Sequence, residues 1–405
     1  MFLAAWCVDG CREPAGAETV SPPNAAPCAP GVRSILSFLL PSLRQTGAVK
    51  ALVRLMMLVG LSELAVFPAS AAFSSLYAFG DGVCTTTDNV DWDPKYYPKT
   101  YSNGRIWIQV LAQRQGLTYD ENKNLSYFGN ASADLVAEVN SFTAPTDVNT
   151  ALFVVWVNDA DFANYMIETY PSYGLDPARW NSMVSSSLVN HQTAIQTLYT
   201  KGVRTLIMPN AVDLGEVAYC ANMSASDKNF IRQGISSFNS SFATVLSQAM
   251  ASLPGLRIYM PDFFALLDNM VVHPGDYGLV NATGGGYATF DGYSTWNGPR
   301  NNWFFWDPWD PTATVHEVVA DVAQQLVSPA KISKVTSLNG SNRLDLANVP
   351  IGLNGFVDAR TNLALGNWTQ LTNFNSTSAT QTIFVPASGQ QRFYRLRFPF
   401  AWSWP

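Results

Sequence analysis

Between residues 73 and 330 the chain alternates short apolar runs with longer amphipathic segments. Continuous apolar runs are typical of strands buried on both faces, whereas apolar positions repeated every three or four residues are typical of helices. The expected strands are 76–79, 151–157, 203–208 and 256–259, and the expected helices are 103–116, 181–200, about 227–253 and 314–326. This alternation predicts an α/β fold, with a parallel sheet between two layers of helices in a three-layer α/β/α arrangement.

The helical period disappears at Lys331. Residues 331–405 carry short strand-like segments, such as 382–385 and 393–397, with Asn, Gly and Ser turns between them. This pattern predicts a small all-β sandwich module that follows the α/β domain of residues 73–330.

Residues 1–72 follow neither pattern. A basic flank, a short apolar stretch and an Ala-x-Ala site occur in this order at Arg44, Lys50 and Arg54, then 55–67, then 69–71. Together these features predict a disordered leader plus a secretory signal peptide cleaved near Ala72, and hence a secreted or cell-envelope protein exported as in bacteria. An N-terminal core helix is the alternative. Whether residues 1–48 are translated is open, because Val49 could mark the start of translation.

Composition and charge exclude several classes of protein. The net charge is −6 and no long basic run occurs, which argues against nucleic-acid binding. No apolar run reaches the roughly 18 residues that a membrane-spanning helix needs. The three histidines, His191, His273 and His316, lie far apart and no Cys-x-x-Cys pair is present, so we expect neither a metal nor a cofactor.

Three segments stand where a site of a parallel sheet is expected, namely 77–82, 154–162 and 306–312. In their order and spacing they resemble the sequence blocks of the GDSL-type lipases and esterases of the SGNH hydrolase superfamily. The resemblance covers roughly residues 73–328, and it is supported by the segments 102–105, 202–215, 239–262 and 273–287. It implies a flavodoxin-like SGNH hydrolase fold and hydrolysis of carboxylic esters, on lipids or on acylated glycans.

The resemblance also implies a catalytic apparatus. In this family a serine in a Gly-Asp-Ser turn attacks the ester, and an Asp-x-x-His motif supplies the base and the acid that orients it. Here Gly82 stands at the nucleophile position and Asp310 at the base position, while Asp307 keeps the place of the orienting acid.

The backbone N–H of the nucleophile, a second-block glycine and a third-block asparagine form the family's oxyanion hole. Gly82 and Gly129 take the first two positions in this sequence. For the third, a direct count from Trp156 gives Ala160, whereas a shift of two residues gives Asn158.

Other residues could carry chemistry instead. Cys84 lies two residues beyond Gly82 and is either a displaced nucleophile or a buried or disulfide-bonded cysteine, with Cys220 as the possible partner. Asp81 could join Asp307 and Asp310 in a cluster that holds a proton or performs inverting glycoside chemistry.

Three tryptophans border the expected site. Trp303, Trp306 and Trp309 either form a platform on which sugar rings or acyl chains stack, or pack in the core and in a loop wall.

The C-terminal module resembles a small β-sandwich tail of exported bacterial proteins, through residues 362–369 and 391–396. That resemblance suggests a surface or matrix accessory domain.

These observations predict an exported protein of the carboxylic-ester hydrolase type that has lost the standard serine mechanism and binds an acyl or glycan ligand. The alternative is an active esterase that acts on a small-molecule, lipid or glycan ester through a displaced nucleophile. A third possibility is a structural cell-surface protein.

Overall fold

The structure, a computed structural model, describes residues 73–88, 94–170, 172, 174–280, 296–298, 300–388 and 391–399. The predicted signal segment within 1–72 lies outside the described residues and stays a prediction. None of the described helices combines the length and the apolar character that crossing a membrane requires.

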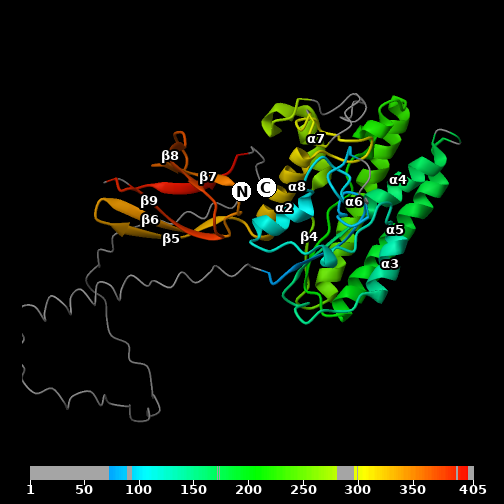
Figure 1. The fold of residues 1–405 in the computed structure, drawn as a ribbon, viewed down its shortest axis with the longest axis horizontal. Helices are drawn as coiled ribbons and strands as arrows, with labels where there is room; N and C mark the ends of the chain where they lie inside the picture. The colour runs from blue at the N-terminus through cyan, green and yellow to red at the C-terminus, as the bar shows by residue number, and fades with distance from the viewer. Residues whose placement is uncertain are drawn as a thin grey trace, which may run out of the picture. The chain divides into compact units, whose positions relative to one another are not determined.

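A parallel four-stranded sheet forms the centre of the α/β domain (Figure 1). Its strands lie in chain order, as β1 (Leu76–Gly80), β2 (Leu152–Trp156), β3 (Thr205–Ile207) and β4 (Arg257–Tyr259). Leu76 pairs with Leu152 and Gly80 with Trp156, so β1 and β2 end at the same edge. Every residue of β1 and β2 is buried, in agreement with the continuous apolar runs in the sequence.

Residues 124–127 extend this sheet on the other side of β1. Leu125 donates its backbone N–H to Ala78 O and Tyr127 donates to Gly80 O, and Ala78 and Asn124 form a parallel bridge. After β1 the chain therefore first forms the segment 124–127 on one side of β1, and then adds β2, β3 and β4 on the other side. This arrangement is the flavodoxin-like order that the sequence predicts.

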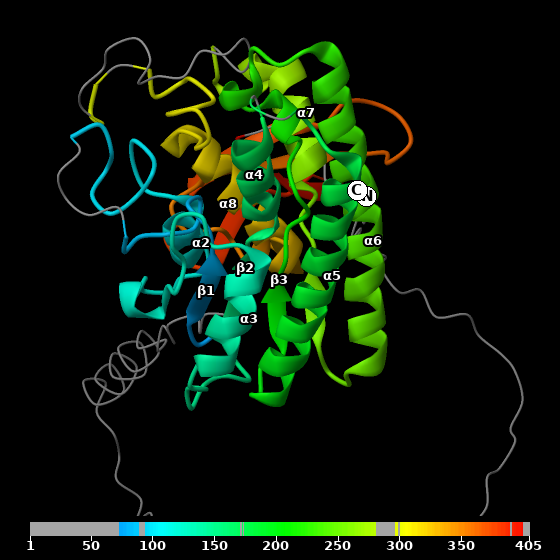
Figure 2. The same cartoon turned by 90° about the vertical axis from the view of Figure 1, so that its right-hand side faces the viewer.

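The helices form two layers. They are α2 (Trp107–Arg114), α3 (Ser132–Ser141), α4 (Asn158–Thr169), α5 (Pro177–Thr200), α6 (Ala225–Ser252), α7 (Phe263–Val272) and α8 (Ala313–Val327). Short 3₁₀ turns occupy Glu121–Lys123, Leu214–Glu216, Ala218–Cys220 and Pro274–Tyr277. Helix α5 packs against α3 and α6, whereas α2 packs against α8 (Figure 2).

Right-handed crossovers explain this division. The connection through α2 leads from β1 to residues 124–127 on one side, whereas the connections through α3, α5 and α6 lead to strands on the other side. Right-handed crossovers that lead to opposite sides of β1 place their helices on opposite faces of the sheet. The three-layer α/β/α prediction is therefore confirmed.

The C-terminal part of the chain is all β. Two antiparallel sheets have the orders β10-β7-β8 and β5-β6-β9. Their strands are β5 (Lys331–Leu338), β6 (Ser341–Ala347), β7 (Asn354–Arg360), β8 (Thr369–Asn375), β9 (Thr380–Pro386) and β10 (Phe393–Arg397). Apolar residues of both sheets share one core, which includes Leu344, Val357 and Val385. The predicted β sandwich is confirmed as a fold class.

Candidate functional site at the carboxyl edge of the sheet

The turn after β1 brings Gly82 to the carboxyl edge of the sheet. Asp81 donates its backbone N–H to Trp156 O at 3.2 Å, and its own carbonyl accepts from Cys84 and Thr85. These hydrogen bonds close a tight turn directly at the end of the strand. The backbone of Gly82 does not lie in the left-handed region, so this position does not need a glycine for its φ angle.

Asp310 lies directly opposite Gly82. A Cβ atom added to Gly82 would lie 3.5 Å from Oδ1 of Asp310. The two positions that the motif order assigns to the nucleophile and the base thus come together in space, although they are far apart in the chain. Neither carries the serine or the histidine of the family pattern.

Asp307 orients the turn that presents Asp310. Its Oδ1 accepts the backbone N–H groups of Trp309 at 2.8 Å and Asp310 at 2.7 Å. Its Oδ2 accepts the hydroxyl of Tyr96 at 2.8 Å. Both carboxylate oxygens of Asp307 therefore accept hydrogen bonds from backbone or tyrosine donors.

Gly129 lies in the wall of the same site. Its φ of +76° is a left-handed conformation that favours glycine, and no atom lies within 4 Å of an added Cβ. The side chain of Asn130 donates to Gly80 O at 3.0 Å, which holds the segment beside the end of β1. Gly129 thus faces the pocket across from Gly82, as expected for the second block.

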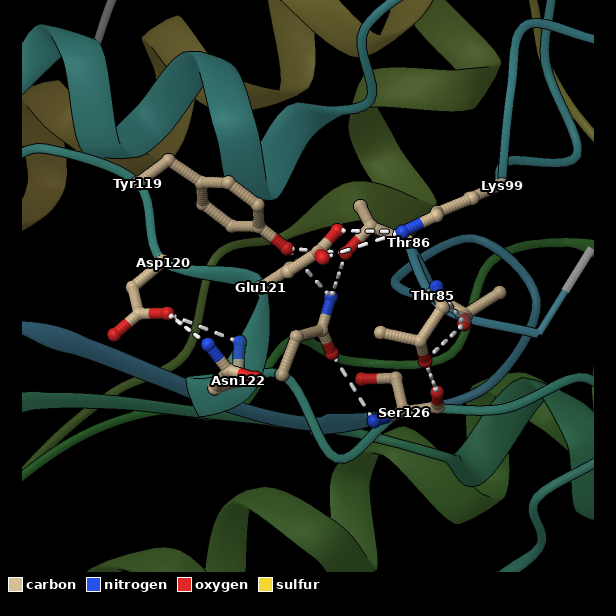
Figure 3. A network of polar contacts seen from close by, with 10 residues as sticks. Thr85, Thr86, Lys99, Tyr119, Asp120, Glu121, Asn122 and Ser126 are labelled. Atoms are coloured by element: carbon tan, nitrogen blue, oxygen red, sulfur yellow. Dashed lines mark hydrogen bonds and ion pairs between the residues drawn. The ribbon is translucent and has the colours of Figure 1, made fainter.

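A polar network fastens the turn after β1 to the segment that precedes Gly129 (Figure 3). The Nδ2 atom of Asn124 lies 2.7 Å from Cys84 O, 3.1 Å from Thr86 Oγ1 and 3.0 Å from Tyr119 Oη. Asn124 Oδ1 accepts the backbone N–H of Ser126 at 3.0 Å. The network fixes the loop that carries Gly82, so its position is set by the fold.

The third block requires a correction. Asn158, expected as an oxyanion donor, is buried and its Nδ2 donates to Pro209 O at 3.0 Å. It does not line the pocket, whereas Ala160 does. The direct count from Trp156, which gives Ala160, therefore agrees with the pocket lining. Asn158 is the first residue of α4, and its side chain is buried away from the pocket. The third-block donor position is held by an alanine methyl group.

Two of the three tryptophans also require a correction. Trp306 is 0% exposed, which leaves no surface for a ligand. The Trp303 ring lies 4.2 Å from the guanidinium of Arg300 and does not line the pocket. Trp309 lines the pocket and stacks on Tyr219 with 4.2 Å between ring centroids.

A deep pocket opens beside Gly82. Its cavity volume is about 140 Å³, and its mouth is open to solvent. Apolar side chains of α4, α7 and α8 and of the loop before α8 make most of its wall, among them Ala163, Ile167, Leu266, Leu267, Met270, Phe304, Phe305, Val315 and Val319. Our sequence reasoning missed α7 as a wall of the site, although the apolar run at residues 263–272 could have indicated it.

The polar groups of the pocket are acidic. Asp81, Asp159, Asp310 and the amide of Asn164 are its charged or amide side chains. Burial raises the pKa of Asp81 to about 7. Burial, followed by the charge of Asp307 and of Asp81, raises the pKa of Asp310 well above its usual range. This shift favours the neutral form of Asp310 and makes its carboxyl harder to ionise than that of an exposed aspartate.

Asp159 behaves in the same way. Burial raises its pKa well above the usual range, with a further contribution from Asp81, although its Oδ1 accepts the N–H of Val212 at 3.0 Å. The sequence analysis did not predict a role for this residue. Its position in the first turn of α4 is the feature that could have indicated one.

Cys84 is poorly placed for catalysis. It is 0% exposed, and burial raises the pKa of its thiol well above 9.0. Cys220 is also buried, and both cysteines are free, so they do not form the disulfide that the sequence left open. The residues that the structure describes contain no group of His, Cys, Asp or Glu suited to a metal ion.

The histidines lie away from the reacting position. His316 is buried on α8, does not line the pocket, and burial lowers its pKa to about 3. His191 donates its Nδ1–H to Ser187 O at 2.8 Å inside α5. Ser187 donates to Asp161 at 2.6 Å, so this serine, histidine and aspartate form a buried structural network whose order differs from that of a catalytic triad.

Comparisons with known proteins were made for the chain. No family model matches it. Among curated proteins, GDSL esterase/lipase At1g71691 of Arabidopsis thaliana is 24% identical over 304 residues, which are 70% of this chain and 74% of the relative. GDSL esterase/lipase 7 of the same plant is 28% identical over 139 residues, 31% of this chain and 38% of the relative.

Solved structures with some similarity include the lipase Lip_vut3 from a goat rumen metagenome, with 11% identity and a TM-score of 0.39 over 62% of this chain and 96% of that one. Another is Axe2, an acetylxylan esterase from Geobacillus stearothermophilus, with 12% identity and a TM-score of 0.36 over 62% and 93% of the two chains.

Proposed function

We propose that this chain, which is a homologue of the GDSL esterase/lipases of the SGNH hydrolase superfamily, binds an acyl-type ligand without hydrolysing it by the serine mechanism. The observation that carries the proposal is the pair of Gly82 and Asp310, which meet where the family has its nucleophile and its base. Gly82 has no atom that could attack a carbonyl. Burial and the neighbouring acids favour the neutral form of Asp310, which is not the form that accepts a proton.

The wall of the pocket supports an apolar ligand over a glycan. Sugar recognition needs several hydrogen-bonding side chains around the ring hydroxyls, and the pocket offers few besides its carboxyls and Asn164. An alkyl or acyl chain would gain roughly 25 cal/mol for each Å² of apolar surface that it buries against α4, α7 and α8.

The enzymatic part is tested with p-nitrophenyl esters and a fluorophosphonate probe. We expect no turnover above the buffer rate and no labelled residue, because Gly82 at the nucleophile position has no side chain. Saturable hydrolysis by the natural chain would contradict this expectation.

Ligand binding is tested with the neutral, apolar dye Nile red. The change Ala163→Phe fills the pocket from α4, and we expect it to weaken dye binding roughly tenfold, since overfilling a site costs about 1–3 kcal/mol. Ala137→Phe on the exposed face of α3 is the matched control. Equal dye binding by both variants would place the ligand outside the pocket.

An active esterase with a displaced nucleophile is the second candidate. Cys84 would be that nucleophile, and its burial and high thiol pKa argue against it. If the natural chain hydrolyses esters and Cys84→Ala abolishes the activity, this candidate replaces the first.

Export remains part of the proposal, on the basis of the basic flank, the apolar stretch and the Ala-x-Ala site. We expect the protein isolated from its native host to begin near Ala72. N-terminal sequencing checks this expectation, and a cytoplasmic protein that still carries residues 44–71 would refute it.

A further inference from the structure

The buried acids of the pocket lack the counter-ions that other buried acids of this chain have. Three buried aspartates elsewhere each contact an arginine: Asp321 with Arg114, Asp213 with Arg232 and Asp358 with Arg395. No lysine, arginine or histidine is among the described residues that line the pocket. The described ion pairs include none with Asp81, Asp159 or Asp310.

Among the described residues, the side-chain hydrogen-bond partner of Asp310 is another carboxyl, that of Asp307. Asp310 is 3% exposed, and it lines the pocket beside Gly82. In the described part of the chain no backbone N–H, hydroxyl or basic group donates to the carboxyl of Asp310, and the group that faces it is the Asp307 carboxyl. Asp81 and Asp159 each accept one backbone N–H, from Val83 and Val212.

Buried carboxyls of this kind cost free energy in either protonation state. When ionised they are desolvated and repel one another, and when neutral they leave polar oxygens without donors. A cation that entered the pocket would relieve both penalties, because it would supply charge and N–H donors to the same oxygens. The aromatic rings of Trp156 and Trp309, which also line the pocket, would favour a cation near their faces.

We propose that the pocket binds a lipophilic ammonium compound, with its alkyl chain between α4, α7 and α8 and its ammonium group against the carboxyls of Asp310, Asp81 and Asp159. The inference rests on the proposed function, since it names the ligand class of the same pocket. The absence of a side chain at Gly82 has a role in it, because a serine there would occupy the space beside Asp310 that the head group takes.

Other head groups fit less well. A carboxylate would add negative charge beside these acids and has no hydrogen to donate to them. An alcohol would donate one hydrogen bond and leave the remaining carboxyl oxygens unsatisfied. An ammonium group donates up to three hydrogen bonds and keeps its charge at neutral pH.

Three amphiphiles of equal chain length test the proposal. Dodecylammonium, dodecanol and dodecanoate compete with Nile red for the natural full-length chain at pH 7.5, each below its micellar concentration. We expect dodecylammonium to bind roughly tenfold or more tightly than dodecanol, since a hydrogen bond to a charged group contributes about 1.5–3 kcal/mol. We expect dodecanoate to bind the weakest of the three.

A matched pair of variants separates the pocket from general electrostatic attraction. Asp310→Asn keeps the shape of the side chain but cannot ionise when an ammonium group binds, so the preference for dodecylammonium over dodecanol should fall by roughly tenfold while dodecanol binding stays the same. Asp276→Asn removes an exposed acid away from the pocket and should leave the preference unchanged.

The outcomes distinguish the two proposals. If dodecanol binds as well as dodecylammonium, or if Asp276→Asn and Asp310→Asn have the same effect, the ammonium inference is wrong and an apolar ligand remains. If none of the three compounds displaces the dye and the dye itself ignores Ala163→Phe, the proposed function is wrong as well.

Discussion

The double change Gly82→Ser with Asp310→His should create esterase activity that the natural chain, on our proposal, lacks. A serine at residue 82 would place its Cβ 3.5 Å from the present Oδ1 of Asp310, so an imidazole at residue 310 would come within reach of the new hydroxyl. Turnover of p-nitrophenyl acetate and fluorophosphonate labelling of the introduced serine are the measurements. We expect both with the double variant.

Each single change should have little effect. Gly82→Ser supplies a hydroxyl beside a neutral carboxylic acid, which does not take up its proton. Asp310→His supplies a base with no nucleophile to activate. Catalytic groups that act as a unit show grossly non-additive effects, so the activity should appear only when both are present.

The backbone at residue 82 accepts a side chain. Its φ angle does not lie in the left-handed region, so an L-residue is not strained there. The added Cβ would lie 2.9 Å from Cδ2 of Phe128, but that ring is 50% exposed and has room to move toward solvent.

Two features should keep the created activity low. Ala160 leaves the third oxyanion donor missing, and deletion of one such donor elsewhere costs about 10²–10³ in rate. Tyr96 already donates to Asp307, and a histidine at residue 310 must compete with it for the same carboxylate.

Adding Ala160→Asn to the double variant should therefore raise the rate by about 10²–10³ if the new amide reaches the oxyanion. Adding Ala137→Asn on the surface of α3 is the control and should change nothing. If the folded double variant is neither labelled nor active, the assignment of residues 82 and 310 to the nucleophile and base positions is wrong.

Much of the fold could be predicted because its strands are short, uninterrupted apolar runs. β2 is an uninterrupted apolar run, and α8 was expected at 314–326 and is found at Ala313–Val327. The helices that were missed have weaker patterns. α4 starts at Asn158 with only Val157 between it and β2, so its first turn was interpreted as a loop, although Asp159 and Asp161 in that turn are typical of a helix N-terminus.

The sequence predicted which residues meet at the edge of the sheet, but it did not predict which side chains face the pocket. The motif order put Gly82, Gly129 and Asp310 at one edge of the sheet, because the carboxyl ends of parallel strands meet there. The motif order did not decide whether Asn158 or Ala160 faces the pocket. Both residues lie in the first turn of a helix, where side chains two residues apart point in different directions. Residue type also did not reveal that Trp306 is entirely enclosed, because burial depends on packing from segments far away in the chain.

The carboxyls of the pocket should make the protein less stable as pH rises, and Asp81→Asn should remove part of that loss. The pKa of Asp81 is about 7 in the folded chain because of burial, against about 3.9 for an unfolded aspartate. Between these two values the folded state holds a proton that the unfolded state has released. Its contribution to stability is thus complete below about pH 4 and is lost as pH rises through about 7.

The groups that face Asp81 act in the same direction. Asp161 adds to the rise of its pKa, and the Asp159, Asp310 and Cys84 groups each feel the charge of Asp81. An ionised Asp81 therefore also makes ionisation of its neighbours harder, and no basic residue lines the pocket among the described residues to offset it.

An asparagine at residue 81 keeps the acceptor for the backbone N–H of Val83 and cannot ionise. We expect Asp81→Asn to melt several degrees above the natural chain at pH 8, because one pKa unit corresponds to about 1.4 kcal/mol. At pH 3.5 the two should melt within a degree or so of each other, because Asp81 is then mostly neutral in both the folded and the unfolded chain. Thermal melts followed by circular dichroism at the two pH values give the comparison, with Asp276→Asn as the surface control. The same melting difference at both pH values would mean that Asp81 does not titrate between them, and that a counter-ion other than the described residues neutralises it.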